Sequence, residues 1–279
     1  MAPVLDALGG DGRQVAHALT TRAGEEGELA LRAVAEGFGT IVAVGGDGTW
    51  SNVGNAILRS GKRTRLGLVP GGTGCDLAKS LGIPQRDVRG CARIVKDGHV
   101  KTIDVGRVEG RHFLNIAGFG YDVAVLEDSW SVRYLEGDLL YLYCAVRQLG
   151  SFPGFGLELQ RDAEAPRRRD LLMLIFANAR IFGGGFKVAP DADLEDGQLD
   201  AIAFGNMGFW ARVGIMQKLR AGTHLRSPHL EACQGRSFVL RFPEPPAYEV
   251  DGEWARALSN EVRVDVVPKA LDVLVPAGA

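Results

Sequence analysis

The sequence predicts a protein of two domains, in which an α/β domain comes first and an antiparallel β-sandwich follows. Three observations support this prediction. Two short apolar runs, over residues 41–44 and 66–69, each end in glycines and lead into a helical pattern, as parallel strands of an α/β sheet do. From residue 101 the pattern changes to short strands separated by turns, which is typical of antiparallel β domains. A chain of 279 residues is long enough for both domains.

The first part of the chain is weakly patterned. Residues 1–12 show little periodicity, and residues 14–19 are predicted to form a short strand that ends at Thr20 and Thr21. Residues 25–36 carry apolar side chains at helical spacing between two glycines, so we expect a helix with one buried face. This helix leads into a strand that begins at Thr40, and the three elements form a β-α-β unit.

The central feature of the first domain is a strand, a glycine-rich turn and a helix in direct succession. Residues 41–44 are apolar without alternation, which predicts a strand buried on both faces of a parallel sheet. Gly45, Gly46 and Gly48 then permit positive φ angles and remove the Cβ atoms near the backbone. A bulky anion could therefore approach the backbone N–H groups directly.

Polar residues continue this turn into the helix. Ser51, Asn52 and Asn55 follow within the expected first helical turn, where unpaired N–H groups and the helix dipole favour phosphate. The pattern therefore indicates a site for nucleotide phosphates. The alternative is a tight strand-to-helix turn that binds no ligand.

A second turn of the same kind follows. Residues 66–70 form a short apolar strand that ends in Pro70, glycines and Thr73, and Asp76 precedes a helix predicted over residues 77–81. Two turns at the ends of neighbouring parallel strands could build one cleft. Residues 86–96 are predicted to be helical from their apolar spacing.

The remaining elements belong to the predicted β domain and its connections. Residues 121–148 interrupt the series of strands, because their apolar side chains predict a helix. A final apolar strand is expected over residues 271–276. Strands are predicted over residues 101–110, 111–118, 155–161, 170–178, 198–204, 237–242, 247–253 and 261–267.

The motifs resemble those of the diacylglycerol kinase catalytic family, which includes bacterial lipid kinases and sphingosine kinases. The resemblance rests first on GGDGT at residues 45–49 and PGGTGCDLAKSLGIP at residues 70–84. It continues in the family's order through IDVGRV (103–108), FLNIAGFGYDV (113–123), GGGFKVAPDADLEDGQLD (183–200) and VDGEW (250–254). It covers nearly the whole chain from Thr20 onward.

The resemblance implies a two-domain plan like that of NAD kinases and diacylglycerol kinases. The expected Rossmann-like, nucleotide-binding α/β domain comprises residues 1–102 and 270–279, because the family's C-terminus returns to the first domain. The expected β-sandwich domain comprises residues 103–269 and contributes the lipid and metal sites. The helix over residues 121–148 either packs on the sandwich or, with Trp130, Tyr134 and Tyr141, lines an opening for acyl chains.

The resemblance also implies a set of nucleotide-binding residues. Thr20 is chosen over Thr21 because it lies four residues before Gly24, as in the family's pattern. Ser51 and Cys75 stand where the family usually has Asn, so nucleotide affinity or base preference is expected to differ from that of relatives. The full set is Thr20, Gly45, Gly46, Asp47, Gly48, Thr49, Trp50, Ser51, Thr73 and Asp76.

Carboxylates in these turns argue for a cation. A bare carboxylate at Asp47 or Asp76 would repel ATP unless Mg²⁺ lies between them, although each could instead cap a helix. The family also binds Mg²⁺ through the side chain at Asp196 and nearby main-chain carbonyls, here those of Asp193 and Gln198. Such ligands suit a hard cation, and a plain Asx turn is the alternative.

Glu253 stands where the family places its proton acceptor. A carboxylate there can take the proton of a lipid hydroxyl as the bond to phosphorus forms, whereas a hairpin turn with a solvated Glu is the alternative. The resemblance therefore predicts a lipid kinase that uses ATP and Mg²⁺ to convert diacylglycerol or a related lipid to its phosphate, with Glu253 and Asp47 as catalytic residues. A non-catalytic homologue that binds nucleotide or lipid is the alternative, and an NAD kinase is less favoured because the second motif follows the lipid-kinase pattern.

Composition sets the expected context. A formal net charge of −2 gives no electrostatic reason to expect nucleic acid. Four scattered cysteines without a CxxC pair favour a reducing cytosol, and no apolar run is long enough to span a bilayer. We expect a cytoplasmic protein that is peripheral to the membrane, and the sequence leaves a homodimer open. Because family members begin with a strand and an Asn-Pro-x-x-Gly turn that we do not find here, we expect the native polypeptide to start upstream, and the alternative is that this chain has lost its first strand.

Overall fold

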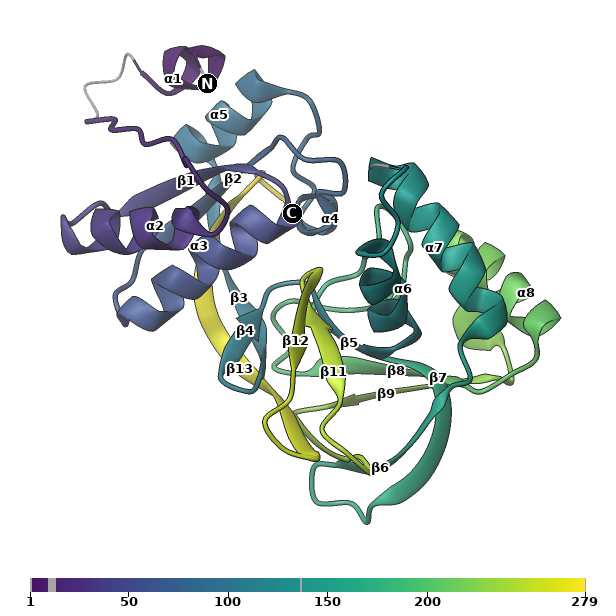
Figure 1. The fold of residues 1–279 in the computed structure, drawn as a ribbon. Helices are drawn as coiled ribbons and strands as arrows, with labels where there is room; N and C mark the ends of the chain where they lie inside the picture. Colours follow the sequence, from purple (N-terminus) through teal and green to yellow (C-terminus); the bar gives the residue numbers. More distant parts are fainter. Residues whose placement is uncertain (1, 10–13, 136, 279) are drawn as a thin grey trace.

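The computed structural model describes residues 2–9, 14–135 and 137–278, and it folds into an α/β domain and a β domain (Figure 1). Residues 1 and 279, at the ends of the predicted first domain, lie outside the described residues. The α/β domain contains α1 (Ala2–Leu8), α2 (Glu25–Ala35), β1 (Thr40–Gly45), α3 (Asp47–Ser60), β2 (Arg65–Pro70), α4 (Asp76–Ser80) and α5 (Val88–Asp97).

The sheet of the α/β domain confirms the predicted parallel strands. β1 pairs in parallel with β2, and β2 pairs in parallel with the end of β13 (Glu261–Val275) through Leu66 and Val273. The expected return of the C-terminus to the first domain is therefore confirmed. Helices α2 and α3 lie on one side of these strands and α1 and α5 on the other (Figure 1). The predicted helices over residues 25–36, 77–81 and 86–96 correspond to α2, α4 and α5.

Two predictions for this sheet are wrong. Residues 14–19 form no strand and are exposed. Within the described residues β1 therefore has β2 as its single partner and lies at the edge of the sheet. Its side chains are mostly half-buried, and Val44 is 38% exposed, so β1 is not buried on both faces.

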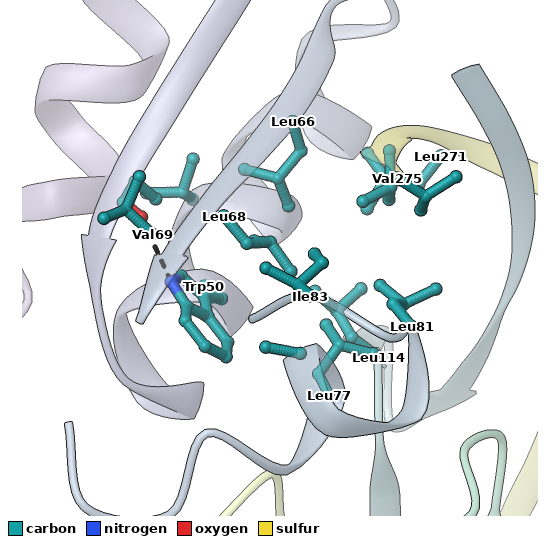
Figure 2. Close-up of a cluster of buried hydrophobic side chains, with 14 of the residues drawn as sticks. Trp50, Leu66, Leu68, Val69, Leu77, Leu81, Ile83, Leu114, Leu271 and Val275 are labelled. Carbon is teal, nitrogen blue, oxygen red and sulfur yellow. Dashed lines mark hydrogen bonds between the residues drawn. The ribbon is translucent and has the colours of Figure 1, made fainter. Parts of the chain in front are cut away.

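A dense apolar core lies beneath the two glycine turns (Figure 2). Trp50 of α3 is fully buried, and its Nε1 donates a hydrogen bond to the Ala43 carbonyl at 3.1 Å. Leu68 of β2 and Leu77 of α4 belong to the same cluster. Leu114, which comes from the β domain, completes it. The core thus packs α3 and α4 against the sheet and fixes where their N-termini lie.

The β domain is antiparallel, as predicted. From β13 its strands follow the order β13-β10-β6-β7-β5-β11-β12, with β4 joined through β3 and β9 through β8 at the sides. The sequence did not predict β9 or α8, and the helix expected over residues 121–148 is two helices, α6 and α7. The elements are β3 (His99–Val108), β4 (Arg111–Phe113), β5 (Ile116–Gly120), α6 (Tyr121–Ser129), α7 (Gly137–Ser151), β6 (Phe155–Arg161), β7 (Arg167–Ala177), β8 (Leu199–Gly205), α8 (Phe209–Ala221), a 3-10 turn (His224–Arg226), β9 (Leu230–Gly235), β10 (Ser237–Arg241), β11 (Ala247–Val250) and β12 (Glu253–Arg256).

Two long strands connect the domains. β3 and β13 pair along their length, and Figure 1 shows β13, in yellow, passing from one domain to the other. Val264 of β13 belongs to the β-domain core, whereas Val273 belongs to the α/β core. The predicted boundaries after residues 102 and 269 therefore fall inside continuous strands. This continuity sets the relative position of the two halves of the site.

Candidate active site

The two glycine turns lie in direct contact. Gly71 N donates a hydrogen bond to the Gly45 carbonyl at 2.8 Å. A Cβ atom on Gly72 would lie only 2.8 Å from Gly46 Cα, so a side chain at this position would push the turns apart. The two strand ends are therefore adjacent, as expected, whereas a single cleft built from both of them stays a prediction.

The N-terminus of α3 opens into a cleft of about 890 Å³. Gly46 is the N-cap and has no side chain to satisfy the first N–H groups of this 14-residue helix. Unpaired N–H groups and the positive end of the helix dipole suit an anion. The structure thus brings together four predicted residues, Thr20, Gly48, Thr49 and Glu253, and adds Thr21, Arg22, Ala23, Gly24, Glu26 and Asn52 to the lining of the cleft.

The β11–β12 hairpin carries Glu253 across to this cleft. Its turn is formed by Asp251 and Gly252, both with positive φ. The Asp251 carboxylate accepts backbone hydrogen bonds from Leu114 at 2.9 Å, Asn115 at 2.9 Å and Ile116 at 3.0 Å. Burial raises the pKa of Asp251, and these backbone bonds oppose the rise. The hairpin is therefore fastened to the segment between β4 and β5.

The carboxylate of Glu253 has partners from both domains. Oε1 accepts a hydrogen bond from Asn52 Nδ2 of α3 at 3.1 Å, and Oε2 forms an ion pair with Arg111 Nη2 of β4 at 2.7 Å. A Cβ atom on Gly48 would lie 3.9 Å from Oε1, so the carboxylate lies over the first turn of α3. The Glu253 side chain is still 43% exposed. A carboxylate therefore lines the cleft beside a helix end whose geometry suits an anion.

Two of these partners differ from expectation. The sequence placed Asn52 near phosphate, but its amide bridges Glu26 Oε1, at 2.8 Å, and Glu253. Arg111 was missed, because it meets Glu253 only through a side-chain contact between residues that are 142 positions apart in the chain. A helical wheel begun at Asp47 would have placed Asn52 on the exposed face with Gly48.

The carboxylates of Asp47 and Asp76 bind backbone around the turns. Asp47 accepts hydrogen bonds from the N–H groups of Asp76 at 3.0 Å and Leu77 at 3.1 Å, so it caps α4 rather than its own helix. Burial is the main cause that raises the pKa of Asp47. Asp76 accepts hydrogen bonds from Lys79 Nζ at 2.9 Å and Gly184 N at 2.7 Å. Their roles toward nucleotide and Mg²⁺ stay predictions.

The side chains of Trp50 and Ser51 do not face the cleft, and their assignment to the nucleotide is corrected here. Trp50 is fully buried beneath β1, and Ser51 is 1% exposed. The helical period explains the difference. Because α3 starts at Asp47, Gly48 and Asn52 point outward, and Trp50 and Ser51 point inward. Asn55 is also turned away from phosphate, since its amide pairs with the backbone of His112 at 2.8 and 3.0 Å.

The second turn contains the two remaining residues of interest. Thr73 is exposed, and its contact with nucleotide stays a prediction. Cys75 has a left-handed backbone with φ of 52° and is the N-cap residue of α4. Its Sγ lies 3.4 Å from the Gly72 carbonyl and 3.8 Å from the Gly45 carbonyl. An amide would suit this position, since Asn tolerates such backbone angles and could donate to both oxygens.

The predicted Mg²⁺ loop has the backbone of an Asx turn. Asp193 Oδ1 accepts from Glu195 N at 3.0 Å, and Asp196 Oδ1 accepts from Gln198 N at 2.9 Å. Burial raises the pKa of Asp196, and the charges of Asp193 and Asp104 add to it, which a cation would offset. Among residues 2–9, 14–135 and 137–278 no group of three His, Cys, Asp or Glu side chains could hold a metal. Backbone carbonyls and water would therefore have to complete the shell of a Mg²⁺ ion.

α7 combines a packed side with an exposed apolar side. Cys144 and Leu149 are buried, as expected for a helix that packs on the sheet. Leu139, Leu142 and Val146, at 66%, 61% and 60% exposure, form a stripe on the outer side. The aromatic residues predicted to line an acyl-chain opening lie in the same region and are exposed, Trp130 by 59%, Tyr134 by 71% and Tyr141 by 50%. In the part of the chain that is described, none of the helices has the length and apolar character needed to cross a bilayer.

Comparisons with known proteins agree with this arrangement. The family model described as the diacylglycerol kinase catalytic domain matches residues 3–108, and the YegS C-terminal NAD kinase beta sandwich-like domain matches residues 115–275. The chain is 31% identical to the diacylglycerol kinase of Bacillus subtilis over 94% of its own length and 86% of that protein. It is 28% identical to the diacylglycerol kinase of Mycobacterium tuberculosis, over 98% of its own length and 85% of that protein. A crystal structure of a diacylglycerol kinase from Bacillus anthracis has the same fold, with a TM-score of 0.70 and 20% identity. The match covers 92% of this chain and 83% of that one.

Proposed function

The chain belongs to the diacylglycerol kinase catalytic family, and from that premise we propose that it is an ATP- and Mg²⁺-dependent lipid kinase whose acceptor is the hydroxyl of diacylglycerol or a related lipid. One observation supports the proposal most strongly. The carboxylate of Glu253, from the β domain, lies over the first turn of α3, from the α/β domain, with Asn52 at 3.1 Å. A proton acceptor thus faces the place where a helix N-terminus and two glycine turns suit phosphate.

The phosphate groups of ATP would bind at the two turns. Backbone N–H groups at the start of α3 supply hydrogen bonds, and the missing side chains at Gly46 and Gly72 let the anion approach the backbone. Most of the rate in phosphoryl transfer comes from such positioning and charge stabilisation. The capping of α4 by Asp47 contributes by fixing the second turn against the first.

Glu253 would act as the general base. The hydroxyl oxygen of the lipid attacks the γ-phosphorus, the bond from that phosphorus to the bridging oxygen of ADP breaks, and the hydroxyl proton passes to Glu253. Asn52 and Arg111 orient the carboxylate through one contact each. A positioned base of this kind contributes roughly 10²–10⁴ to the rate.

Mg²⁺ would supply positive charge that offsets the charge of the phosphates. Asp47 and Asp76, at the two turns, are the acids proposed to face that ion. Asp196, with the main-chain carbonyls of Asp193 and Gln198, is the donor set proposed for a further Mg²⁺ ion outside the lining of the cleft, and the mutual repulsion of the acidic side chains there supports that choice.

The lipid would approach from a membrane surface. We propose that the outer side of α7 rests on the bilayer, because the stripe of Leu139, Leu142 and Val146 would otherwise face water. Tyr141 on the same helix suits the headgroup layer, where a ring can be apolar on its body and polar at its tip. The protein would then be a peripheral enzyme that draws its acceptor from the membrane.

The experiment is transfer of the labelled γ-phosphate of ATP, with and without Mg²⁺, to mixed micelles that contain diacylglycerol, monoacylglycerol, sphingosine or ceramide. We expect labelled phosphatidic acid from diacylglycerol that requires Mg²⁺. A labelled product from another lipid would change the acceptor but keep the kinase. Nucleotide binding without any labelled lipid would favour the non-catalytic homologue.

A further inference from the structure

Two carboxyl groups lie together behind the catalytic hairpin. Asp122 is in the first turn of α6, and Glu249 on β11 is paired with Gly118 on β5. A Cβ atom on Gly118 would collide with Asp122 Oδ2 and would lie 3.1 Å from Glu249 Oε1. The space above Gly118 is therefore filled by both carboxyl groups, and only glycine fits beneath them.

No ordinary donor satisfies these carboxyl groups. Within the described residues, both oxygens of Asp122 and Oε1 of Glu249 are buried without a partner at full hydrogen-bond geometry. Burial raises the pKa of Asp122 more than the backbone N–H groups of Asp122 and Val123, at the start of α6, lower it. Buried carboxylates without donors are costly, and two of them side by side cannot both ionise. A single proton between them removes both problems, because the protonated acid donates to the ionised one.

The electrostatic environment favours retention of this proton. Burial raises the pKa of Glu249 well above its ordinary value, and the charge and hydrogen bond of Asp122 raise it further. Burial also raises the pKa of Asp122, to about 6, while the hydrogen bond with Glu249 opposes that rise. Asp251, in the turn that follows β11, is the further charged group that acts on Glu249. Tyr121, next to Asp122 on α6, is a titratable neighbour, and burial and then the charge of Asp122 raise its pKa. Gly118 of β5 and Trp254 of β12, the strand partners of Glu249, carry no titratable group.

The pair joins α6 to the hairpin that carries Glu253. Glu249 is the cross-strand partner of Trp254, the residue after Glu253. Trp254 makes a second connection, because its Nε1 donates to Glu127 Oε1 of α6 at 2.9 Å. β12 is the last strand of its sheet and pairs with β11 alone among the described strands. A push passed from Glu249 to its partner Trp254 can therefore move β12, whose residues are half-buried or exposed, while β11 keeps its pairing with β5.

We propose that Asp122 and Glu249 share one proton and thereby act as positioning residues for Glu253, so that loss of this proton displaces the hairpin and lowers turnover at alkaline pH. The inference rests on the proposed kinase function. When the proton leaves, two like charges face each other in a buried site with no donor between them, and the repulsion acts on the strand that leads to Glu253.

The test is the pH dependence of kcat for lipid phosphorylation between about pH 5 and about pH 10. Glu249→Gln replaces the titrating acid by an amide, which donates to Asp122 at every pH. Glu36→Gln, at the exposed end of α2, is the matched control. We expect kcat of the wild type and of the control to fall about tenfold on the alkaline side, and that of Glu249→Gln to stay level. Parallel alkaline limbs in all three proteins would overturn the proposal.

A second readout separates this proposal from the kinase function. The folded state keeps a proton that the unfolded chain releases near the ordinary pKa of Glu, so the stability of the wild type falls as pH rises through the folded pKa. Thermal unfolding should show this fall in the wild type and lose it in Glu249→Gln. If the wild type phosphorylates no lipid but still differs from Glu249→Gln in the pH dependence of its thermal stability, the kinase function is refuted and the shared proton is supported. Stabilisation of the wild type, but not of Glu249→Gln, by added Mg²⁺ or Ca²⁺ at alkaline pH would assign the pair to a cation and overturn the shared proton.

Discussion

The substitution Asp251→Asn tests whether one buried carboxylate fastens the β11–β12 hairpin that carries Glu253. The carboxylate accepts three backbone hydrogen bonds, one at Oδ2 and two at Oδ1. An amide keeps one acceptor oxygen, but its NH₂ group would face the Leu114 N–H, so a donor would meet a donor. The residue is 8% exposed, which leaves little room for water to replace the lost partner.

The expected cost follows from these bonds. A hydrogen bond to a charged group contributes about 1.5–3 kcal/mol, and the two remaining bonds weaken when their acceptor becomes neutral. Removal of a buried charge returns part of this loss, because burial raises the pKa of Asp251. We therefore expect the free energy of unfolding to fall by about 2–3 kcal/mol, which corresponds to a drop in Tm of roughly 3–5 °C for a chain of this size.

The assay is urea unfolding followed by circular dichroism, together with the turnover of lipid phosphorylation. Asp162→Asn is a matched control, because Asp162 also accepts two backbone hydrogen bonds in a positive-φ turn but is exposed. We expect it to cost less than about 1 kcal/mol and to leave turnover unchanged. Asp251→Asn should lower turnover about tenfold or more through Glu253. Equal stability and turnover in the two variants would refute the reasoning.

Two further predictions concern the second turn and the outer side of α7. Cys75→Asn should raise the free energy of unfolding by about 0.5–1 kcal/mol, because Asn tolerates positive φ and can donate to the Gly72 carbonyl; lower stability by thermal unfolding would contradict this. The double substitution Leu142→Ser and Val146→Ser should weaken sedimentation with phosphatidylglycerol vesicles about tenfold, whereas Leu258→Ser, at 91% exposure, should not. Loss of self-association with unchanged vesicle binding would assign this face to a second copy of the chain.

Local pattern was sufficient for the elements that are buried and regular. The apolar run before Gly45 and its repeat before Gly71 predicted two parallel strands, and the alternation in residues 155–161 predicted β6. The strand expected over residues 14–19 is absent because a short apolar segment becomes a strand only when a neighbour pairs with it and buries one face. The same lack of a neighbour leaves β1 at the edge of its sheet, which no local pattern reveals.

The sequence predicted the parts of the site that the backbone forms, and it did not predict the directions in which side chains point. The glycine turns meet as expected, since glycine is required wherever two backbones approach closely. Trp50 and Ser51 were misplaced because the first turn of α3 begins at Asp47, which rotates both inward. Asp47 caps a helix from the other turn, and Arg111 of β4 meets Glu253 of β12 through a side-chain ion pair between strands that do not pair with each other. Contacts between segments distant in sequence leave no periodicity to detect.

The most direct test of the central claim is the comparison of ATP binding with turnover in Glu253→Gln. The variant keeps the size of the side chain and its contact with Asn52 but loses the basic oxygen. We predict that the Kd for ATP, measured by calorimetry, stays within about threefold of the wild type, while kcat for lipid phosphorylation falls by roughly 10²–10⁴. Turnover within about twofold of the wild type would contradict the role of Glu253 as base.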